Sequence, residues 1–258
     1  MKRSDLICEN GVINDKDSSE IVHKFTLYRT KCTEITIDKA MSDILKKPEG
    51  RYITIFCNNG DYGKCFEKIL ADLMPKGKAL VAGLGNESIC SDSLGAKALR
   101  YIPATAHLSG IKEFSELGLR EIFVIGTSVT GKTGFESTEQ IKCIAERVNA
   151  DFVIAIDCLA CSETERLCRT IQITDGGIAL GAGVGNNRKE LNRHTIGKDV
   201  IAIGVPTVID FDSASSLMVT PRNIDVIIDE FSEIIGRGIS RALNTSLSAE
   251  ELNSLIIR

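Results

Sequence analysis

Two apolar segments of strand length each lead to an aspartate, and they constrain the fold more than any other feature of the chain. Residues 78–84 (Lys-Ala-Leu-Val-Ala-Gly-Leu) are followed by Asp92, and residues 152–156 (Phe-Val-Ile-Ala-Ile) run directly into Asp157. Continuous apolar runs of this length are typical of strands buried on both faces of a parallel sheet. Loops that follow such strands share the carboxyl edge of the sheet, where open α/β folds bind ligands. The pattern therefore predicts that Asp92 and Asp157 lie at one edge of one sheet.

From residue 78 onward the chain alternates between strand and helix patterns. Strands are predicted at residues 78–84, 121–125, 152–156, 170–173 and 200–205, the last ended by Pro206. Helices are predicted at residues 93–101, 136–148, 188–193 and 221–244, the last with Thr220 as its cap and an isoleucine-rich apolar stripe. This alternation favours an α/β fold: a three-layer, mostly parallel, doubly wound sheet with helices on both faces, like that of phosphorylase- and hydrolase-type folds.

The first 75 residues have a different pattern. Residues 21–30 and 33–37 alternate like antiparallel strands, 51–57 is another strand, and 38–45 and 61–74 are helical. No linker-like stretch separates this region from the rest. We therefore expect one α/β domain over residues 1–258, in which 1–75 form an antiparallel N-terminal extension of the sheet and 76–258 form the core.

Composition excludes several classes of protein. The 258 residues carry a net charge of −4 with acids and bases interspersed, so no nucleic-acid footprint is expected. No apolar stretch approaches the ~20 residues that a membrane span needs, and none at the amino terminus resembles a secretory signal, so a cytoplasmic protein without membrane contact is expected. The nine cysteines include Cys158, Cys161 and Cys168, but no second close pair completes a zinc site. Buried packing is the favoured role for these thiols, and neither a metal nor a cofactor is expected.

Each aspartate also has a purely structural interpretation. Asp92 is suited to cap the helix that follows it, and acids often end parallel strands only to cap a turn. Asp210, after the strand at residues 200–205, is a third acid at the same predicted edge. A catalytic interpretation therefore depends on Asp92 and Asp157 occurring together, because two carboxylates in one site can share a proton.

A competing motif lies between the two strands. The segment from Gly126 to Thr133 (Gly-Thr-Ser-Val-Thr-Gly-Lys-Thr) matches the phosphate-loop pattern, with a predicted strand before it and a helix after it. In that alternative the backbone N–H groups and Lys132 would bind a nucleotide phosphate. Gly134 weakens the alternative, since it adds a flexible step where the phosphate-binding helix has to continue.

Taken in order, the loops resemble the germination protease family of spore-forming Firmicutes. The similarity covers nearly the whole chain. It is carried by Gly83-Leu-Gly-Asn86 with Asp92, Val129-Thr-Gly-Lys-Thr-Gly134, Ala155-Ile-Asp-Cys-Leu-Ala160, Thr170-Ile-Gln-Ile173, Gly183-Val-Gly-Asn186 and Ile203-Gly-Val-Pro-Thr-Val208. Arg3-Ser-Asp-Leu6, Lys47-Pro-Glu-Gly-Arg-Tyr52 and Val219-Thr-Pro221 resemble the start, middle and tail of the family. The phosphate-loop pattern then becomes a turn of the same fold.

The resemblance implies an activity and a site. It implies a cytoplasmic endopeptidase of the spore core or forespore, with the fold of hydrogenase-maturation peptidases, made as a zymogen and assembled as a homotetramer. Its substrates would be small acid-soluble spore proteins, and its catalytic aspartates fall on Asp92 and Asp157. Substrate-binding residues are expected at the glycine-rich loops: Asn86, Gly183, Gly185, Asn186 and Arg188. A non-catalytic sporulation protein on the same fold stays open as an alternative, beside the nucleotide-binding enzyme.

The chain departs from the family pattern near the expected cleft. An Asp-Thr-Gly-Ile…Pro-Gly-Ser-Gly stretch of the family is here Asp175-Gly-Gly-Ile followed by Leu180-Gly-Ala-Gly183. The chain is also short for the family, with an insertion missing between Asp210 and Val219. Because these changes lie beside the cleft, the sequence specifies the expected chemistry more firmly than the substrate.

Overall fold

The computed structural model describes residues 4–9, 21–179, 189–212 and 217–255. Within these residues nine strands form one sheet: β1 (Val22–Leu27), β2 (Thr30–Ile37), β3 (Gly50–Phe56), β4 (Ala79–Gly83), β5 (Ile122–Gly126), β6 (Phe152–Cys161), β7 (Thr170–Thr174), β8 (Asp199–Asp212) and β9 (Leu217–Val219). The helices are α1 (Lys39–Leu45), α2 (Tyr62–Leu73), α3 (Leu94–Ala98), α4 (Lys112–Glu116), α5 (Thr130–Thr133), α6 (Ser137–Arg147), α7 (Arg193–Ile196), α8 (Ile224–Leu243) and α9 (Ala249–Leu255).

The sheet is mixed rather than mostly parallel. Its order is β1-β2-β3-β7-β8-β6-β4-β5, with β9 paired to β8. Within the described residues, the pairs β5–β4, β4–β6 and β6–β8 are parallel. The pairs β1–β2, β2–β3, β3–β7, β7–β8 and β8–β9 are antiparallel. The expectation of a mostly parallel sheet is therefore wrong, because β7 and β9 pair antiparallel with β8, whereas the antiparallel N-terminal extension is confirmed.

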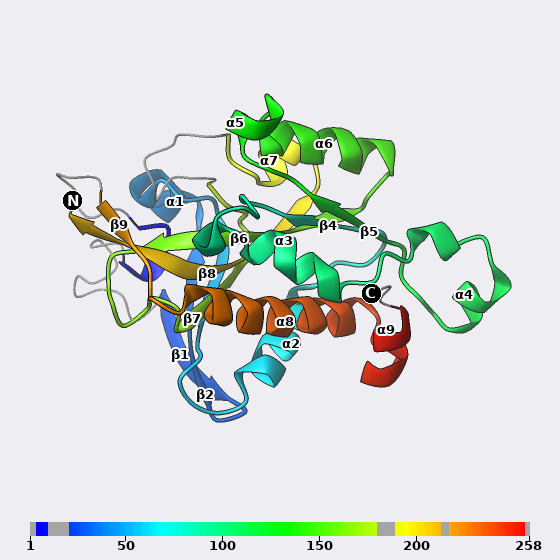
Figure 1. Cartoon of the computed structure of the whole chain (residues 1–258), viewed down its shortest axis with the longest axis horizontal. Coiled ribbons are helices and arrows are strands. Elements are labelled where there is room, and N and C mark those ends of the chain that lie inside the picture. The colour runs from blue at the N-terminus through cyan, green and yellow to red at the C-terminus, as the bar shows by residue number, and fades with distance from the viewer. Residues whose placement is uncertain (1–3, 10–20, 180–188, 213–216, 256–258) are drawn as a thin grey trace.

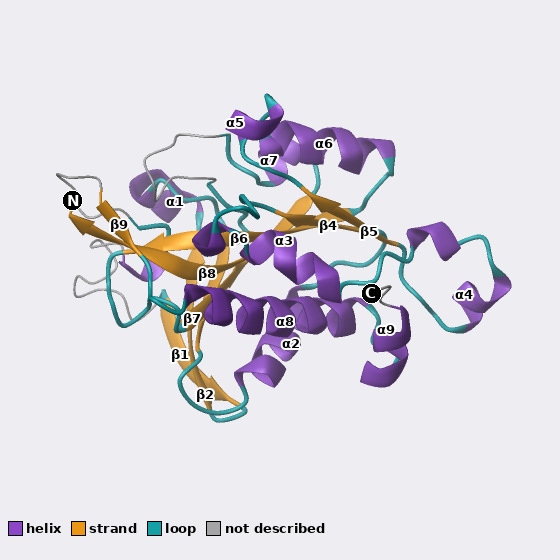
Figure 2. Ribbon diagram, viewed as in Figure 1, coloured by secondary structure: helices purple, strands orange, loops and turns teal. Residues whose placement is uncertain are grey.

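Helices cover both faces of the sheet, as Figures 1 and 2 show. On one face α2, α3 and α8 pack against alternate residues of the central strands, such as Val81 of β4 and Ile154 of β6. On the other face α6 and α7 cover the residues in between, such as Leu80 and Val153. Successive side chains of a strand point to opposite faces, so a continuous apolar run is what a strand covered on both sides requires.

The predicted elements agree with the structure except at several boundaries. β8 continues through Pro206 to Asp212, because Pro206 lies at an irregularity where Leu159 pairs with Pro206 and Ala160 with Val208. A proline that lacks an N–H is tolerated at such a bulge. β6 likewise continues past Asp157 to Cys161, so this acid lies within a strand and does not end it.

Two predicted helix starts are also wrong. The helix predicted at residues 188–193 is α7, which begins at Arg193 because Asn192 and Thr195 form a capping box. The helix predicted from residue 221 is α8, which begins at Ile224 with Asn223 as its N-cap. Thr220 does not cap this helix, since its hydroxyl donates to the carbonyl of Thr207, 2.8 Å away.

None of the helices in the described residues is both long and apolar enough to cross a membrane.

Candidate active site

Asp92 and Asp157 lie in the wall of the same cavity, at the carboxyl edge of the parallel strands. The cavity has a volume of about 200 Å³. Its lining includes the loop after β4, the part of β6 that begins at Asp157, the starts of α5 and α6 at Val129 and Ser137, and Thr207 of β8. Both acids are half-buried. The juxtaposition that the two apolar strands predict is therefore present.

The backbone around Gly85 holds Asp92 in place. Asp92 ends a short 3-10 helix, Cys90–Asp92, that follows the loop after β4. The N–H of Asn86 donates to Oδ2 of Asp92 (2.8 Å) and to its carbonyl oxygen (3.0 Å). This turn needs glycine at position 85 for two reasons. The φ of Gly85 is +96°, which is accessible mainly to glycine, and a Cβ at this position would collide with the Asp92 carbonyl oxygen. A backbone N–H donated to a carboxylate stabilises its ionised form.

Asp157 is held by the ladder of the sheet. It lies in β6 opposite Gly204 of β8, one residue after Ile156, whose carbonyl accepts the N–H of Leu84 at 2.9 Å. The thiol of the neighbouring Cys158 is affected by both acids. Burial raises the pKa of this thiol well above the ordinary value, and the negative charges of Asp157 and Asp92 raise it further. The side chain next to Asp157 thus lies within electrostatic range of both carboxylates.

Gly95 seats α3 directly on the two strands that lead to the acids. A Cβ at this position would collide with the backbone N of Leu84 and would lie 2.5 Å from the carbonyl oxygen of Ile156. Leu84 immediately follows β4 and Ile156 immediately precedes Asp157. The helix that begins just after Asp92 therefore touches the backbone of both strands without an intervening side chain.

Asp5, an acid to which the sequence analysis assigned no role in the site, also lines the cavity. The N–H of Asp5 donates to the Ala160 carbonyl (2.9 Å), and its Oδ2 accepts the N–H of Ala160 (2.7 Å). The amine of Lys47 donates to the Asp5 carbonyl at 3.1 Å. Asp5 and Ala160 are 155 positions apart, so no local pattern could have indicated this contact.

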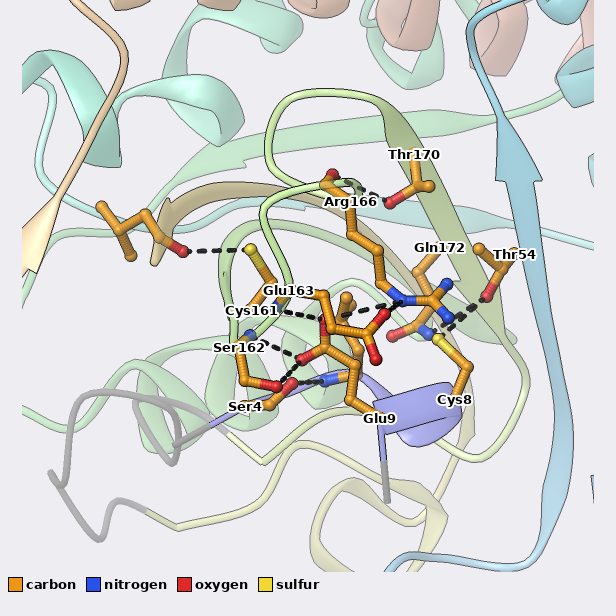
Figure 3. A network of polar contacts seen from close by, with 12 residues as sticks. Ser4, Cys8, Glu9, Thr54, Cys161, Ser162, Glu163, Arg166, Thr170 and Gln172 are labelled. Atoms are coloured by element: carbon orange, nitrogen blue, oxygen red, sulfur yellow. Dashed lines mark hydrogen bonds and ion pairs between the residues drawn. The ribbon is translucent and has the colours of Figure 1, made fainter. Parts of the chain in front are cut away.

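The same amino-terminal segment is fixed a few residues further on by Glu9 (Figure 3). Its carboxylate accepts the backbone N–H of Ser162 (2.6 Å), the Ser162 hydroxyl (2.8 Å) and the N–H of Glu163 (3.1 Å). Arg166 lies 3.5 Å from the same carboxylate, whose side chain is only 1% exposed. Residues 4–9 are thereby attached to the end of β6 beside the cavity.

Of the residues predicted to bind substrate, the structure describes Asn86 and leaves four outside the described residues. Asn86 is 8% exposed, and its side-chain oxygen accepts hydrogen bonds from Ser88 N–H (3.1 Å) and from the Lys132 amine (2.7 Å). Gly183, Gly185, Asn186 and Arg188 lie outside the described residues, as do the departures at Leu180 and Ala182. Gly176, the remaining departure, packs near Tyr52 and the Glu49 carbonyl. Asp210 lies in β8, paired with Met218, and its side chain is outside the described part.

The phosphate-loop pattern does not have phosphate-loop geometry. The helix that contains Lys132 is α5, a single turn of four residues, and it ends at Gly134 with φ +74°. A phosphate-binding loop needs a helix that continues beyond the lysine, so that its N-terminal N–H groups and dipole face the anion. The Lys132 amine instead donates to Asn86 Oδ1 and to Ser88 Oγ, both at 2.7 Å.

Among the described residues no cluster of three or more histidine, cysteine or acidic side chains is arranged to hold a metal ion. Cys158 and Cys168 are partly buried and Cys161 is buried, all three as free thiols. The fold and the cavity together define an α/β protein with an acidic cleft at the edge of its parallel strands.

Comparison with known proteins identifies the family. Residues 9–216 match the family Peptidase_A25, described as germination protease. The chain is 35% identical to a germination protease of Clostridium tetani (strain Massachusetts / E88), over 98% of this chain and 99% of that protein. It is 37% identical to a germination protease of Bacillus cereus (strain G9842), over 81% of this chain and 60% of that protein. The chain belongs to the germination protease family and is a peptidase.

Among solved structures, the chain is similar to the [NiFe] hydrogenase maturation protease HycI from Thermococcus kodakarensis KOD1. The similarity has a TM-score of 0.43 at 18% sequence identity and covers 68% of this chain and 98% of that one.

Proposed function

We propose that this peptidase is an endopeptidase that hydrolyses small acid-soluble spore proteins by a two-aspartate mechanism. The observation that carries the proposal is the shared cavity, into whose wall the fold brings Asp92 from the loop after β4 and Asp157 from β6. The family membership supports the substrate class. By the same resemblance we propose a homotetrameric protein of the spore core, made as a zymogen, in which Gly183, Gly185, Asn186 and Arg188 contact the substrate.

The chemistry follows from the proximity of two carboxyl groups. Two carboxylates in one small cavity repel each other when both are ionised, so one of them retains a proton. The ionised carboxylate takes a proton from water as the water oxygen attacks the scissile carbonyl carbon. The protonated carboxyl group donates its proton either to the oxygen of the scissile carbonyl, as negative charge develops there, or to the departing amine. The products are a carboxylic acid and an amine, and both side chains return to their starting state after a proton is exchanged.

The test compares the wild-type chain with Asp92→Asn and Asp157→Asn on purified small acid-soluble spore proteins. An amide neither accepts the proton of water nor donates as a carboxylic acid does. We therefore expect each variant to lose roughly 100- to 10,000-fold in kcat while keeping its melting temperature within a few degrees. Mass spectrometry of the fragments gives the cleavage positions. Cleavage by either asparagine variant at the wild-type rate would sink the mechanism, and an inactive wild-type chain would favour the non-catalytic alternative.

A further inference from the structure

Lys132 is the residue of the phosphate-loop pattern that the proposed peptidase chemistry leaves without a role. It lies in α5, which follows β5 in the chain, and its amine reaches the loop after β4. The Nζ atom is 2.7 Å from Asn86 Oδ1 and 2.7 Å from Ser88 Oγ. Hydrogen bonds from a charged donor are about twice as strong as neutral ones. Lys132 thus bridges two segments that are more than forty positions apart in the chain.

The bridge ends one hydrogen bond away from Asp92. The residue that receives the amine, Asn86, donates its own backbone N–H to the Asp92 carboxylate at 2.8 Å and to the Asp92 carbonyl at 3.0 Å. Asn86 is 8% exposed, and its side-chain oxygen also accepts the N–H of Ser88. Displacement of Asn86 would therefore move the donor that orients the carboxylate of Asp92.

The loop is tied to the rest of the fold at several points. The N–H of Leu84 donates to the Ile156 carbonyl at 2.9 Å, and Arg100 donates to the Glu87 carboxylate at 2.6 Å. Residues 84–92 lie outside the strands, and the turns from Ile89 to Asn86 and from Asp92 to Ile89 are bonds within the loop itself. Thr207 anchors the far end, where its hydroxyl donates to the Ser91 carbonyl at 2.7 Å. Lys132 anchors the near end at Asn86. Fixing both ends limits the positions that Asp92 can take.

We propose that Lys132 is a positioning residue for Asp92, acting through Asn86. The inference rests on the proposed peptidase function. It also gives Asn86 a role other than substrate contact, since the side-chain oxygen of Asn86 is engaged by Lys132 and Ser88 while its backbone N–H holds the carboxylate. The two roles differ in kinetics: loss of a substrate contact raises KM, whereas misplacement of a catalytic carboxylate lowers kcat.

The experiment uses the full chain with Lys132→Met, Lys132→Arg, Asn86→Ala and the double variant Lys132→Met/Asn86→Ala. Methionine matches the alkyl part of the lysine side chain and lacks its amine donors. Alanine at Asn86 keeps the backbone N–H. Displacement of a catalytic group by about 1 Å costs about 100-fold, so we expect kcat to fall roughly 10- to 100-fold in each single variant, with KM within twofold of wild type. Lys142→Met, on the exposed surface of α6, is the matched control and keeps wild-type kinetics.

Two further results identify the route of the effect. Arginine has donors for the same two oxygens, so Lys132→Arg restores most of the lost kcat. Since both single changes break one bridge, the double variant loses no more than the worse single variant. Additive losses, a rise in KM at constant kcat, or an equal loss in Lys142→Met would each overturn the inference.

Hydrogen exchange separates this inference from the proposed function. Lys132→Met should speed amide exchange at residues 84–92 by about tenfold or more, and Lys142→Met should leave it unchanged, whether or not the chain cleaves spore proteins. If Asp92→Asn is active and Lys132→Met shows faster exchange, the two-aspartate function is refuted and the hydrogen-bond bridge from Lys132 to Asn86 is supported. An inactive Asp92→Asn variant with unchanged kcat and exchange in Lys132→Met keeps the function and refutes the bridge.

Discussion

Replacing Gly85 with alanine tests whether the backbone at this glycine sets the position of Asp92. The residue has a φ of +96°, and an added Cβ would collide with the Asp92 carbonyl oxygen and lie 2.9 Å from its Oδ1. Gly197 provides a matched comparison. Its φ is +76°, but a Cβ there meets no atom within 4 Å. The two glycines share a left-handed backbone and differ in what surrounds the missing side chain.

The difference in surroundings predicts a difference in stability. A left-handed conformation costs a residue with a Cβ about 1–2 kcal/mol, and this cost applies at both positions. Forcing extra atoms into a packed site costs a further ~1–3 kcal/mol, and this cost applies only at Gly85. The free energy of unfolding should therefore fall by about 1–2 kcal/mol in Gly197→Ala and by about 2–5 kcal/mol in Gly85→Ala. The atoms in the way at Gly85 include a backbone carbonyl, which cannot turn aside as a flexible side chain does.

Urea denaturation followed by circular dichroism measures both values, and turnover of spore proteins measures the effect on the site. We expect Gly85→Ala to lose kcat by roughly 100-fold, because relief of the collision moves Asp92. Gly197 caps the end of α7, and α7 does not line the cavity, so Gly197→Ala should keep its activity. Equal destabilisation of the two variants, or full activity in Gly85→Ala, would refute the view that this glycine fixes the carboxylate.

Two further expectations concern stability. Glu9→Ala should lower the free energy of unfolding by about 1–3 kcal/mol in urea melts, because it removes the buried acceptor of the Ser162 N–H and hydroxyl, whereas Arg166 keeps its 2.8 Å ion pair with Glu163. An unchanged free energy of unfolding would contradict this. Burial raises the pKa of Cys57 to about 12 and that of Cys158 well above its ordinary value, so the unfolded chain loses these protons first as the pH rises. The free energy of unfolding should therefore be unaffected by these thiols below about pH 8 and should fall above it by up to ~1.4 kcal/mol per pH unit for each thiol. Cys57→Ala should reduce this slope. If the two thiols were solvated in the folded chain, the slope would be absent.

Local patterns predict the parts of the fold that depend on local physics. The runs at residues 78–84 and 152–156 became β4 and β6 because both faces of these strands are covered by helices. The apolar stripe of α8 is buried as expected, with Ile228, Ile235 and Ile239 fully inside. The start of α7 had a local signal as well, since Asn192 and Thr195 have the spacing of a capping box.

Long-range pairing accounts for what the sequence does not show. β7 (Thr-Ile-Gln-Ile-Thr) alternates polar and apolar residues, and this alternation does not specify that its partners are β3 and β8, both antiparallel to it. Pro206 ends an isolated strand pattern, but the bulge that accommodates it depends on Leu159 of another strand. Asp5 joins the cavity through Ala160, which no pattern near either residue specifies.

Gly95 packs directly against the backbone of Leu84 and Ile156, so the distance between the two acids does not depend on the length of the loops elsewhere in the chain. Three backbone segments in contact define where Asp92 and Asp157 lie, and the connections that leave this contact, such as residues 103–121 with α4, run elsewhere on the molecule. Such connections can be lengthened or shortened without altering the spacing of the acids.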